Sequence, residues 1–417
     1  MTMKIGIIGG GIIGLSSAYY LTQSGHEVTI IDPSDLSDGC SHGNAGMIVP
    51  SHFIPLAAPG MVTKGIRWMF NSSSPFFVRP RMSLDLIRWG LLFLKKANAK
   101  HVAESAPALK ELSLLSKFYY QQLASELPYD FGYREKGLMM LYQTKEAEHE
   151  ETGTVKMAND IGIEAKVLSH EEVQQLEPHV KVNCRGGIYF PGDAHLTPQQ
   201  LFSGLKDYLK SRGVTFLTGT SATGFHISEG KILSVQTDAG VFSYDQIVLA
   251  AGSWSGLVAE KLKLNLPMQA GKGYSFTLEN IDKNVQIPSI FLEARVAVTP
   301  MGNSLRFGGT MEITGIDHAV NRKRVKGIVD SIPTYYPDMK VEMPSVEKVW
   351  HGLRQCSPDG LPYIGRSENL KNLVIATGHS MMGLSLAPAT GKLVSEIIDE
   401  RNTSMPLAAF APQRYQR

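Results

Sequence analysis

The stretch from residue 4 to residue 21 constrains the fold of this chain more than any other. An apolar run is followed by three glycines in the pattern G-x-G-x-x-G, which is typical of a buried parallel strand that turns into a helix. The first glycine permits the tight bend, the second has no Cβ to hold a phosphate away, and the third lets the helix pack closely on the strand. The helix N-terminus directs its N–H groups and the positive end of its dipole at the anion. The predicted dinucleotide contacts are Gly9, Gly11, Ile12, Ile13 and Gly14.

A second predicted strand supports the same site. Residues 26–32 follow a helix stop at Ser24 and Gly25, and Asp32 stands at the C-terminal end of this strand. A carboxylate at this place accepts hydrogen bonds from the ribose hydroxyls of a dinucleotide. Its negative charge disfavours a 2′-phosphate. Asp32 therefore argues against NADP and leaves NAD or the AMP half of FAD.

Composition narrows the class of protein. The length of 417 residues suits two domains, and 43% hydrophobic with 19% charged residues is the composition of an ordered globular protein. A net charge of +2 gives no basis for nucleic-acid binding. The three cysteines form no C-x-x-C pair, which argues against a metal site or a disulfide framework and favours a reducing compartment.

The apolar N-terminal run resembles a signal peptide. Removal of this run would destroy the nucleotide fingerprint, so we expect a cytoplasmic protein rather than an exported one. No other run of 18 or more apolar residues occurs in the sequence, and a membrane-spanning helix is not expected.

Residues 40–52 are dense in small and polar side chains and too irregular for a helix or a strand. Such a loop can wrap a cofactor with its own N–H groups and polar side chains. Composition alone favours an ordinary surface loop. The position just after Asp32 favours the cofactor role, because this connection passes the middle of the cofactor in a dinucleotide-binding fold. The predicted contacts are Ser41, His42, Asn44, Ala45, Gly46 and Met47.

Residues 61–100 interleave aromatic and aliphatic side chains with eight Lys or Arg residues and a single acid, Asp85. A basic amphipathic stretch of this kind can lie in a membrane interface beside anionic lipid. A pair of helices that cover a domain core, with Arg and Lys stems packed along it, gives the same pattern. The core interpretation is preferred, and peripheral membrane contact stays open.

The rest of the chain predicts further α/β structure. We expect helices at 106–127, 146–161, 169–176 and 198–211, a strand pair at 131–142, and strands at 214–217 and 246–251 with a hairpin between them. Thr197 is expected to cap the helix at 198–211. The strand at 246–251 ends in small residues, which lets its backbone approach the dinucleotide. The predicted contacts here are Ala251, Gly252 and Trp254.

Five motifs in this order resemble the D-amino-acid oxidase superfamily of FAD enzymes. They are the Gly9–Gly14 turn, Asp32, the Ser41–Gly46 loop, the run Ala250-Ala251-Gly252-Ser253-Trp254 and the segment from Pro358 to Gly365. Within this superfamily the chain is most similar to the bacterial D-amino-acid dehydrogenases, including relatives that act on D-hydroxyproline. The resemblance covers essentially the whole chain.

The resemblance implies an α/β fold with noncovalently bound FAD. A Rossmann-like FAD-binding domain (1–60, 196–266 and 346–417) is interrupted by a substrate domain (61–195 and 267–345) with a mainly antiparallel sheet flanked by helices. The α-C–H of the substrate passes a hydride to flavin N5, and water hydrolyses the imino acid to a 2-oxo acid and ammonia. The chain displays no dedicated proton acceptor, and we expect none to be essential, because an amine that enters in its neutral form can release hydride directly.

The same resemblance implies the residues that face the substrate. Arg354 lies in a segment similar to the family's G-L-R-P motif and is expected to grip the substrate carboxylate, although a structural arginine is the alternative. Strands at 271–276, 291–300 and 305–312 are expected to roof the flavin. Glu293 and Arg295 would then share one face, and His52 could reach the same cavity. An exposed sheet charge or a loop histidine is an equally open interpretation for each of these three residues.

Residues 373–391 are expected to form a strand, a tight turn and a helix. In the family this helix aims its N-terminus at the flavin O2 and stabilises negative charge there. The predicted contacts are Gly378, His379, Met381, Met382, Gly383 and Leu384, with His379 also a candidate catalytic residue. Simple core filling is the alternative for the two methionines.

We therefore expect an FAD-dependent D-amino-acid dehydrogenase, whose substrates include cyclic ones such as D-hydroxyproline or D-proline. Its electrons would pass to a quinone or a carrier protein. A sarcosine or glycine type of oxidase that uses oxygen is one alternative. An FAD-containing electron-transfer subunit of a membrane complex is another, and the basic segment 61–100 is its motive.

Overall fold

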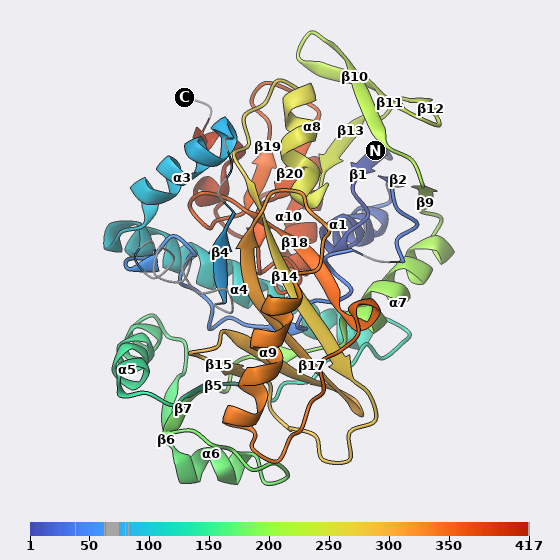
Figure 1. Ribbon diagram of the computed structural model, residues 1–417. Helices are drawn as coiled ribbons and strands as arrows, with labels where there is room; N and C mark the ends of the chain where they lie inside the picture. The colour runs from blue at the N-terminus through green and yellow to red at the C-terminus, as the bar shows by residue number, and fades with distance from the viewer. Residues whose placement is uncertain (38, 62, 64–74, 80, 82, 416–417) are drawn as a thin grey trace.

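The computed structural model describes residues 1–417 except 38, 62, 64–74, 80, 82 and 416–417. Two large sheets organise the chain (Figure 1). A mainly parallel sheet with its helices occupies the upper half of the view, and a larger, mainly antiparallel sheet runs from the centre to the lower half. The chain passes back and forth between the two sheets. This arrangement confirms the predicted fold class, and the predicted domain boundaries stay a prediction.

The parallel sheet has six strands with β1 (Lys4–Ile8) near its centre. The strands β2 (Glu27–Asp32) and β13 (Gln246–Leu249) flank β1 in the parallel direction. Farther out, β9 (Thr215–Thr218) and β20 (Leu373–Thr377) are also parallel, while β19 (Tyr363–Arg366) closes one edge antiparallel. The carboxyl ends of the five parallel strands therefore meet at one edge, where open α/β sheets bind their ligands.

Both faces of this sheet are covered, and its strands β1, β13 and β20 are mostly apolar and buried, whereas the edge strand β9 is partly exposed. One face packs on α1 (Ile12–Gln23) and α10 (Ala387–Ile398), which cross each other closely. A Cβ on Gly391 would lie 2.4 Å from the backbone of Ser16, so a larger residue would separate the two helices. The other face packs on α8 (Ser255–Lys261) and a small sheet of β10 (Ala222–Ser228), β11 (Lys231–Thr237) and β12 (Gly240–Phe242).

The larger sheet has the order β21-β18-β14-β17-β16-β15-β5-β7-β6, and β4 pairs with β17 off this path. Its strands are β4 (Phe76–Val78), β5 (Leu138–Tyr142), β6 (Lys166–Ser169), β7 (Gly186–Phe190), β14 (Gln269–Leu278), β15 (Ser289–Phe291), β16 (Val296–Met301), β17 (Ser304–Ile313), β18 (Trp350–Cys356) and β21 (His379–Ser380).

The two faces of this sheet have different roles. Helix α9 (Arg322–Tyr335) crosses in front of one face, where Tyr274, Phe276 and Phe307 pack in the same buried cluster as the helix. The opposite face carries Gly271, Gly273 and Ser275 on β14, because side chains alternate along a strand. This second face meets the loop that follows β2.

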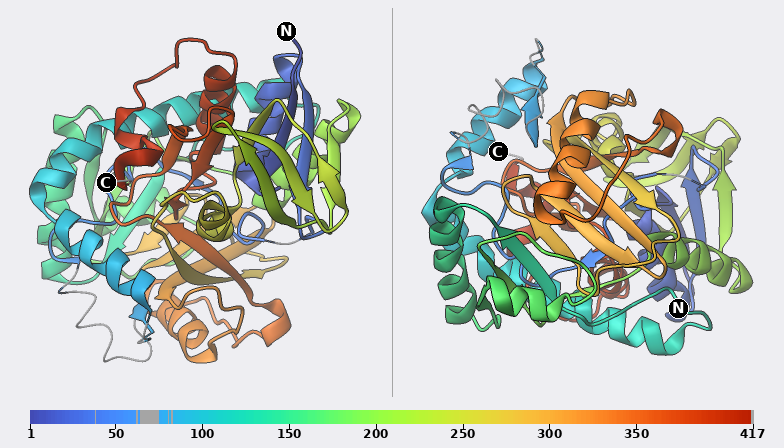
Figure 2. Two further views of the ribbon diagram at one scale, coloured as in Figure 1. Left: turned by 90° about the horizontal axis from the view of Figure 1, so that it is seen from above. Right: turned by 60° about the horizontal axis from the view of Figure 1, so that its bottom comes forward.

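The remaining helices lie outside the sheets. They are α3 (Leu84–Lys96), α4 (Ala99–Glu126), α5 (Lys145–Asp160), α6 (His170–Leu176) and α7 (Pro198–Ser211). Both views in Figure 2 show α3 at the edge of the molecule. In the part of the chain that the structure describes, no helix has the length and apolar character needed to cross a membrane. Residues 62, 64–74, 80 and 82 of the basic segment lie outside the described residues.

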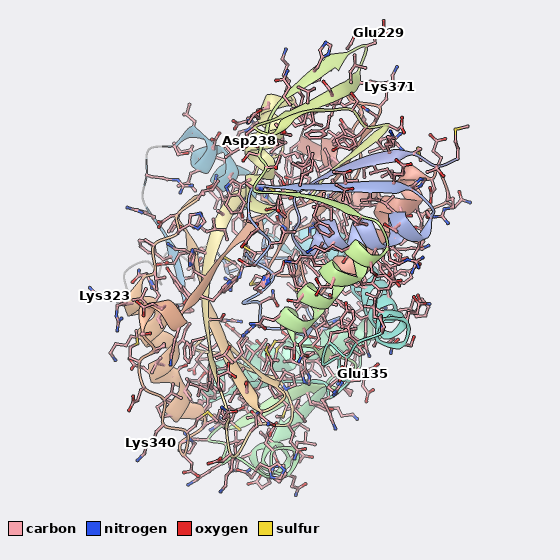
Figure 3. All side chains as sticks on the ribbon, turned by 90° about the vertical axis from the view of Figure 1, so that its right-hand side faces the viewer. Glu135, Glu229, Asp238, Lys323, Lys340 and Lys371 are labelled. Atoms are coloured by element: carbon pink, nitrogen blue, oxygen red, sulfur yellow. The ribbon has the colours of Figure 1, made fainter. Side chains whose placement is uncertain are left out.

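Charged side chains mark the outer surface. Glu229 at the tip of the β10–β11 hairpin, together with Lys323 and Lys340 around α9, projects from the outline (Figure 3). Helix α9 turns a polar side to solvent and packs its opposite side on the larger sheet, and the hairpin packs on the parallel sheet.

Four local predictions were wrong or incomplete. Residues 291–300 form two antiparallel strands joined by a turn at 292–295, not one strand. Residues 131–142 hold one strand, β5, and an isolated bridge at Arg134 rather than a strand pair. Helix α10 begins at Ala387, well after the turn at Gly378. Thr197 occupies the N-cap of α7, but its side chain makes no capping hydrogen bond.

Candidate cofactor and substrate site

The turn from β1 into α1 has the steric properties predicted for a phosphate cradle. Gly9 has a φ of 108°, and a Cβ there would lie 2.4 Å from the carbonyl oxygen of Ala250. A Cβ on Gly14 would lie 2.0 Å from the carbonyl oxygen of Gly9. A Cβ on Gly11 would meet only Ser41 Oγ, at 3.9 Å. Gly9 and Gly14 are thus needed for packing, whereas Gly11 opens onto free space.

The N–H groups around this space are partly engaged. Ser41 Oγ accepts a hydrogen bond from the Ile12 N–H at 3.1 Å, so the loop caps the helix from outside. Asp32 accepts from the Gly10 N–H at 2.7 Å and from Ser34. Since an ionised carboxylate offers about four acceptor positions, Asp32 keeps capacity for a ribose hydroxyl. Among the described residues, none accepts from the N–H of Gly11 or Ile13.

The loop at 41–47 is fixed from the opposite side by the larger sheet. Arg306 of β17 donates through Nη1 to the carbonyl oxygens of His42 and Asn44, both at 2.9 Å. Ser275 Oγ donates to the Gly43 carbonyl at 2.7 Å. Burial lowers the pKa of Arg306 to about 10, so the guanidinium stays charged at neutral pH. The substrate sheet therefore holds the loop by its carbonyl groups, while the N–H groups of His42 and Gly46 are bonded within the loop.

Side chains of this loop divide between packing and the site. The His42 ring packs on Phe202 of α7, with ring centroids 4.3 Å apart. Asn44 Oδ1 accepts from the Gly46 N–H at 2.8 Å and stabilises the turn. Ala45 and Met47 join a buried cluster that also contains Met382. Met47 begins β3 (Met47–Ile48), which pairs with β8 (Ala194–His195).

The other predicted cofactor contacts lie at the ends of β13 and β20. Ala251 precedes a 3₁₀ turn at Gly252–Trp254, and Trp254 is 42% exposed and stacks on His318. Gly378 has a φ of 77°, and Met381 is exposed. A Cβ on Gly383 would meet only the Cβ of His379, at 3.8 Å, so Gly383 also faces open space. The Leu384 carbonyl accepts from Tyr120 Oη at 2.6 Å, which anchors the turn to α4.

The His379 side chain is buried behind this turn. Its Nε2 lies 3.0 Å from Thr390 Oγ1, whose only hydrogen is donated to the Leu386 carbonyl, so Nε2 is the donor. Among the described residues, none hydrogen-bonds the buried Nδ1. Burial lowers the pKa of His379 to about 3. A neutral ring with 1% exposure suits a role in positioning the turn better than proton transfer.

Arg354 lies on the face of β18 that looks toward the loop. Its Nη1 donates to the Thr310 carbonyl, and a Cβ on Gly273 would lie 2.2 Å from the guanidinium. The Arg354 guanidinium therefore lies against β14 at Gly273, which has no side chain in its way. Burial lowers the pKa of Arg354, and no carboxylate of the described residues forms an ion pair with it. A half-buried cation without an anionic partner is suited to bind an anion.

A β-bulge positions the carbonyl that Arg354 contacts. The register between β14 and β17 shifts between Lys272↔Glu312 and Tyr274↔Gly309, which leaves one extra residue in β17. Thr310 stands there with a φ of 70°, a conformation that is rare for a β-branched residue. The bulge turns the Thr310 carbonyl toward Arg354 and Met311 toward Gly271. No sequence signal predicted this bulge.

Glu293 does not stand on the sheet face as expected. It lies in the turn between β15 and β16, where its carboxylate accepts from the N–H groups of Gln143 and Thr144 and from Tyr335 Oη. Thr144 is the N-cap of α5, so Glu293 stabilises the entry to that helix. With these donors the carboxylate is satisfied within the protein. The role predicted for it toward a substrate nitrogen has no geometric support here.

His52 belongs to a buried polar chain that sequence analysis missed. Its Nδ1 lies 3.1 Å from Ser51 Oγ, which donates to Asp193 Oδ2 at 2.5 Å. The Ser51 N–H also donates to Asp193, at 3.1 Å. Burial and the Arg295 charge lower the pKa of His52 to about 4, and burial raises the pKa of Asp193 to about 7. Asp193 precedes β8, far from His52 in sequence, so no local pattern joins them.

The site has the donors and the space that a dinucleotide needs. Asp32, Gly11 and Gly383 follow β2, β1 and β20, which lie in one parallel sheet and end at the same edge. Along this edge come a ribose acceptor, N–H groups without a partner among the described residues, and a backbone turn without side-chain obstruction. These residues fit FAD: Asp32 would hold the adenosine ribose, and the N–H groups of Gly11 and Ile13 would donate to the pyrophosphate.

Comparisons with known proteins agree with this geometry. Residues 4–397 match the model of the DAO family, described as FAD dependent oxidoreductase. The chain is 31% identical to a D-amino acid dehydrogenase of Granulibacter bethesdensis, over 99% of this chain and 100% of that protein. It is also 31% identical to a D-amino acid dehydrogenase of Allorhizobium ampelinum, over 99% of both chains. The crystal structure of glycine oxidase from Geobacillus kaustophilus has the same fold, with a TM-score of 0.79, 24% identity and coverage of 99% and 100%.

The family match covers the glycine cradle, both sheets and Arg354, which are the parts of the molecule that carry the predicted site. The chain belongs to the DAO family of FAD-dependent oxidoreductases, and FAD is its cofactor.

Proposed function

We propose that this protein oxidises the bond between the α-carbon and the nitrogen of a D-amino acid. The observation that carries this proposal is Arg354, a half-buried guanidinium with no carboxylate partner among the described residues. Curated relatives at 31% identity over the full length are named D-amino acid dehydrogenases, which supports the D configuration and the reaction class.

In this proposal Arg354 binds the α-carboxylate through its guanidinium fork. The Thr310 carbonyl orients the fork, and the absence of a side chain at Gly273 leaves room for it. A fixed carboxylate and a second contact near the nitrogen together determine which face of the α-carbon is presented. Bound FAD supplies the acceptor for the hydride that leaves the α-carbon.

The space beside Arg354 suits a compact substrate. On this face the Arg354 guanidinium lies over Gly273, and Met311 and Cys356 lie over Gly271, whereas a Cβ on Gly308 would meet only Ser275 and the Tyr274 carbonyl, at 3.5 and 3.7 Å. We include cyclic substrates such as D-proline and D-hydroxyproline, because they offer the same carboxylate and the same C–H beside a nitrogen.

The acceptor is proposed to be a quinone or a carrier protein. The test is turnover of a panel of D-amino acids with and without an artificial electron-accepting dye, with the 2-oxo acid identified by mass spectrometry. A dehydrogenase forms the oxo acid with the dye and produces little hydrogen peroxide in air. Stoichiometric hydrogen peroxide in air instead selects an oxygen-using oxidase of the glycine or sarcosine type.

Helix α3 supports a peripheral contact with an anionic membrane. Leu84, Ile87, Leu91 and Leu94 recur at helical spacing and are exposed by 85, 53, 63 and 54%. Trp89, on the opposite side, is buried and donates through Nε1 to the Cys356 carbonyl at 2.9 Å. Exposed Arg88 and Lys95 flank the apolar stripe. An apolar stripe bordered by cations fits the interface of a bilayer with anionic lipid, where a quinone would also be found.

An FAD-containing electron-transfer subunit of a membrane complex is the second candidate. The exposed stripe of α3 favours it. It differs from the first proposal in one outcome, because such a subunit binds FAD and membranes but is not reduced by any amino acid.

A further inference from the structure

We propose that Asp193, Ser51 and His52 form a relay that takes the proton from the ammonium group of the substrate. His52 receives the proton, and Ser51 passes the equivalent of that proton to Asp193, which stores it. This inference rests on the proposed function, because the oxidation of an amine by hydride loss requires the nitrogen to be neutral. It supplies a proton acceptor that sequence analysis did not find.

The hydrogen bonds of the chain define the direction of the relay. The Ser51 hydroxyl has one hydrogen, and the 2.5 Å contact with Asp193 Oδ2 assigns that hydrogen to the carboxylate. Ser51 Oγ must then accept from His52 Nδ1, 3.1 Å away. The His52 ring is therefore the Nδ1–H tautomer, and its Nε2 carries a lone pair. Among the described residues, none hydrogen-bonds this Nε2.

Contacts on either side of His52 in the sequence join its segment to the sheet that carries Arg354. The Gly43 carbonyl is bound by Ser275 on the face that carries Arg354. Leu56, farther along, packs in the cluster of Met311 and Cys356, and Met311 Sδ lies 3.9 Å from Arg354 Nη1. His52 lies between these two contacts in the sequence, and the Arg295 charge, from the turn before β16, acts on its ring.

The charges around the chain favour storage on Asp193. Lys117 of α4 lies close enough for its charge to oppose the effect of burial on Asp193, yet the pKa of Asp193 is still raised to about 7. Arg295, from the turn before β16, disfavours a charged His52, whose pKa burial already lowers to about 4. His195, near Asp193, also has its pKa lowered to about 4 by burial and stays neutral. A proton that arrives at His52 is thus more stable on Asp193.

Each bond that breaks in this proton transfer is matched by one that forms. One N–H bond of the substrate ammonium breaks and an N–H bond forms at His52 Nε2. The Nδ1–H bond breaks as a bond to Ser51 Oγ forms, and the original Ser51 O–H bond breaks as Asp193 Oδ2 is protonated. The products are a neutral amine, a neutral His52 with hydrogen on Nε2, an intact Ser51 hydroxyl and a neutral Asp193. The relay is reset when the hydrogens run back along the same chain: Asp193 returns its proton to Ser51 Oγ, Ser51 returns one to His52 Nδ1, and Nε2 releases its proton to the medium.

Ser51→Ala and Ser51→Thr form the matched pair that tests this relay. The alanine variant removes the connecting hydroxyl, whereas the threonine variant keeps it. The holoenzyme is mixed anaerobically with the D-amino acid that reduces it fastest, in weak buffer with a pH-indicator dye. We expect wild type and Ser51→Thr at pH 8 to reduce the flavin before a proton appears in the medium. In Ser51→Ala, we expect proton release to accompany a reduction about 100-fold slower.

The pH profile gives a second readout. The bimolecular rate constant of flavin reduction in wild type should rise as Asp193 ionises near pH 7, because the ionised carboxylate is the free acceptor. In Asp193→Asn, which keeps the hydrogen bond from Ser51, this step should vanish and the rate should follow the titration of the substrate ammonium. Proton release and pH profiles like those of wild type in both Ser51→Ala and Asp193→Asn would overturn the relay.

Infrared spectroscopy of the wild type covers the case in which the variants do not fold. Anaerobic reduction by a D-amino acid at pH 8 should produce the C=O stretch of a protonated carboxyl group, shifted by ¹³C labelling of aspartate. A spectrum without this band would overturn the relay while the proposed function stands. A flavin that no D-amino acid reduces would instead contradict the proposed function, and the relay with it.

Discussion

The substrate side of the site depends on how one cation is held. Arg354 is partly removed from water, and a strained backbone carbonyl at Thr310 is the partner that the structure gives it. Burial of a cation with only a neutral acceptor costs free energy, which a bound carboxylate recovers. In the proposed role of Arg354, the protein is thus prepared for an anion before the anion arrives.

Replacing Arg354 tests this preparation. Arg354→Ala or Arg354→Lys should raise KM for the D-amino acid by the equivalent of about 2 to 4 kcal/mol, because the bidentate pair is lost from a half-buried site. Steady-state kinetics with the electron-accepting dye measure the effect. Arg212→Lys makes the same chemical change at an exposed position and should leave KM as it is. An unchanged KM in both Arg354 variants would remove Arg354 from the carboxylate role.

Two glycines of the cradle should respond differently to the same methyl group. Gly11→Ala adds a Cβ into the open space, so the fold should persist while the Kd for FAD rises about 10- to 100-fold, for one or two weakened charge-assisted hydrogen bonds. Gly14→Ala drives a Cβ to 2.0 Å from the Gly9 carbonyl and should lower the Tm of the apoprotein as well. Flavin content and thermal unfolding measure both. Gly153→Ala, in open space on α5, is the control. If Gly11→Ala bound FAD as tightly as wild type, the phosphate-binding role of the turn would be contradicted.

Residues differ in how well sequence predicts them, for a physical reason. Gly9 and Gly14 are required by the local strand-to-helix turn, so a short motif suffices. Asp193, Ser51 and Arg306 act through contacts between segments far apart in the chain, and no local pattern indicates which loop a buried charge will meet. Glu293 was predicted wrongly because its place followed from a strand that the chain does not form.

At the scale of elements, α3 combines two opposite requirements. Its Trp89 side binds the body of the protein, and its opposite side exposes four large apolar residues. This helix therefore agrees with both interpretations of the basic segment, because one of its sides packs on the protein and the opposite side is exposed to solvent. A hydrophobic stripe of this size on a surface usually marks a contact.

Charge placed on the stripe should prevent membrane binding. The double change Ile87→Glu and Leu91→Glu should weaken binding to liposomes with anionic lipid by about 3 to 6 kcal/mol, since two large side chains lose their burial. Co-sedimentation measures this loss. Wild-type binding should also weaken with salt, because Arg88 and Lys95 interact with the headgroups. Val241→Glu, at a position 67% exposed on β12, is the control. Equal sedimentation of the double variant and wild type would contradict the contact.

Element types were more predictable than their limits. The strands and helices of the parallel sheet follow strong apolar periodicity and were predicted well. The larger sheet was harder to predict, because glycines and a bulge interrupt its alternation at β17 and a four-residue turn divides 289–301. Local strand propensity does not distinguish one long strand from a hairpin when apolar residues continue through the turn.

At the scale of the whole molecule, the C-terminal tail is fastened to the segment between the two sheets. Arg414 forms a bidentate pair with Asp359, with Nε to Oδ2 at 2.7 Å and Nη2 to Oδ1 at 3.1 Å. The guanidinium also lies 3.9 Å above the Tyr363 ring. Asp359 is 2% exposed. Burial alone would raise the pKa of Asp359, but the Arg414 charge and hydrogen bonds outweigh it and hold the pKa below its usual value.

Removal of the Arg414–Asp359 ion pair should destabilise the fold in a pH-dependent way. Arg414→Met should reduce the free energy of unfolding by about 3 to 5 kcal/mol at pH 7, because Asp359 is left buried and unpaired. A depressed pKa in the folded state stabilises the wild type above about pH 4, and this contribution is lost as the pH falls through the folded value.

In the variant, buried Asp359 should protonate already above pH 4, so the deficit relative to wild type should shrink toward pH 5. Denaturant unfolding at pH 5 and 7 measures the difference. Arg401→Met breaks a more exposed pair with Asp399 and should cost no more than about 1 kcal/mol. If Arg414→Met also reduced the free energy of unfolding by no more than about 1 kcal/mol, the predicted role of the Arg414–Asp359 ion pair would be contradicted.

The proposed function requires an FAD that a D-amino acid reduces. The most direct measurement is an anaerobic absorbance spectrum of the purified protein during titration with D-, L- and N-methyl amino acids and both epimers of D-hydroxyproline. We expect a flavin spectrum that at least one D-amino acid bleaches and that its L-enantiomer leaves unchanged. A flavin spectrum that no D-amino acid bleaches, or a protein that binds no flavin, would contradict the account.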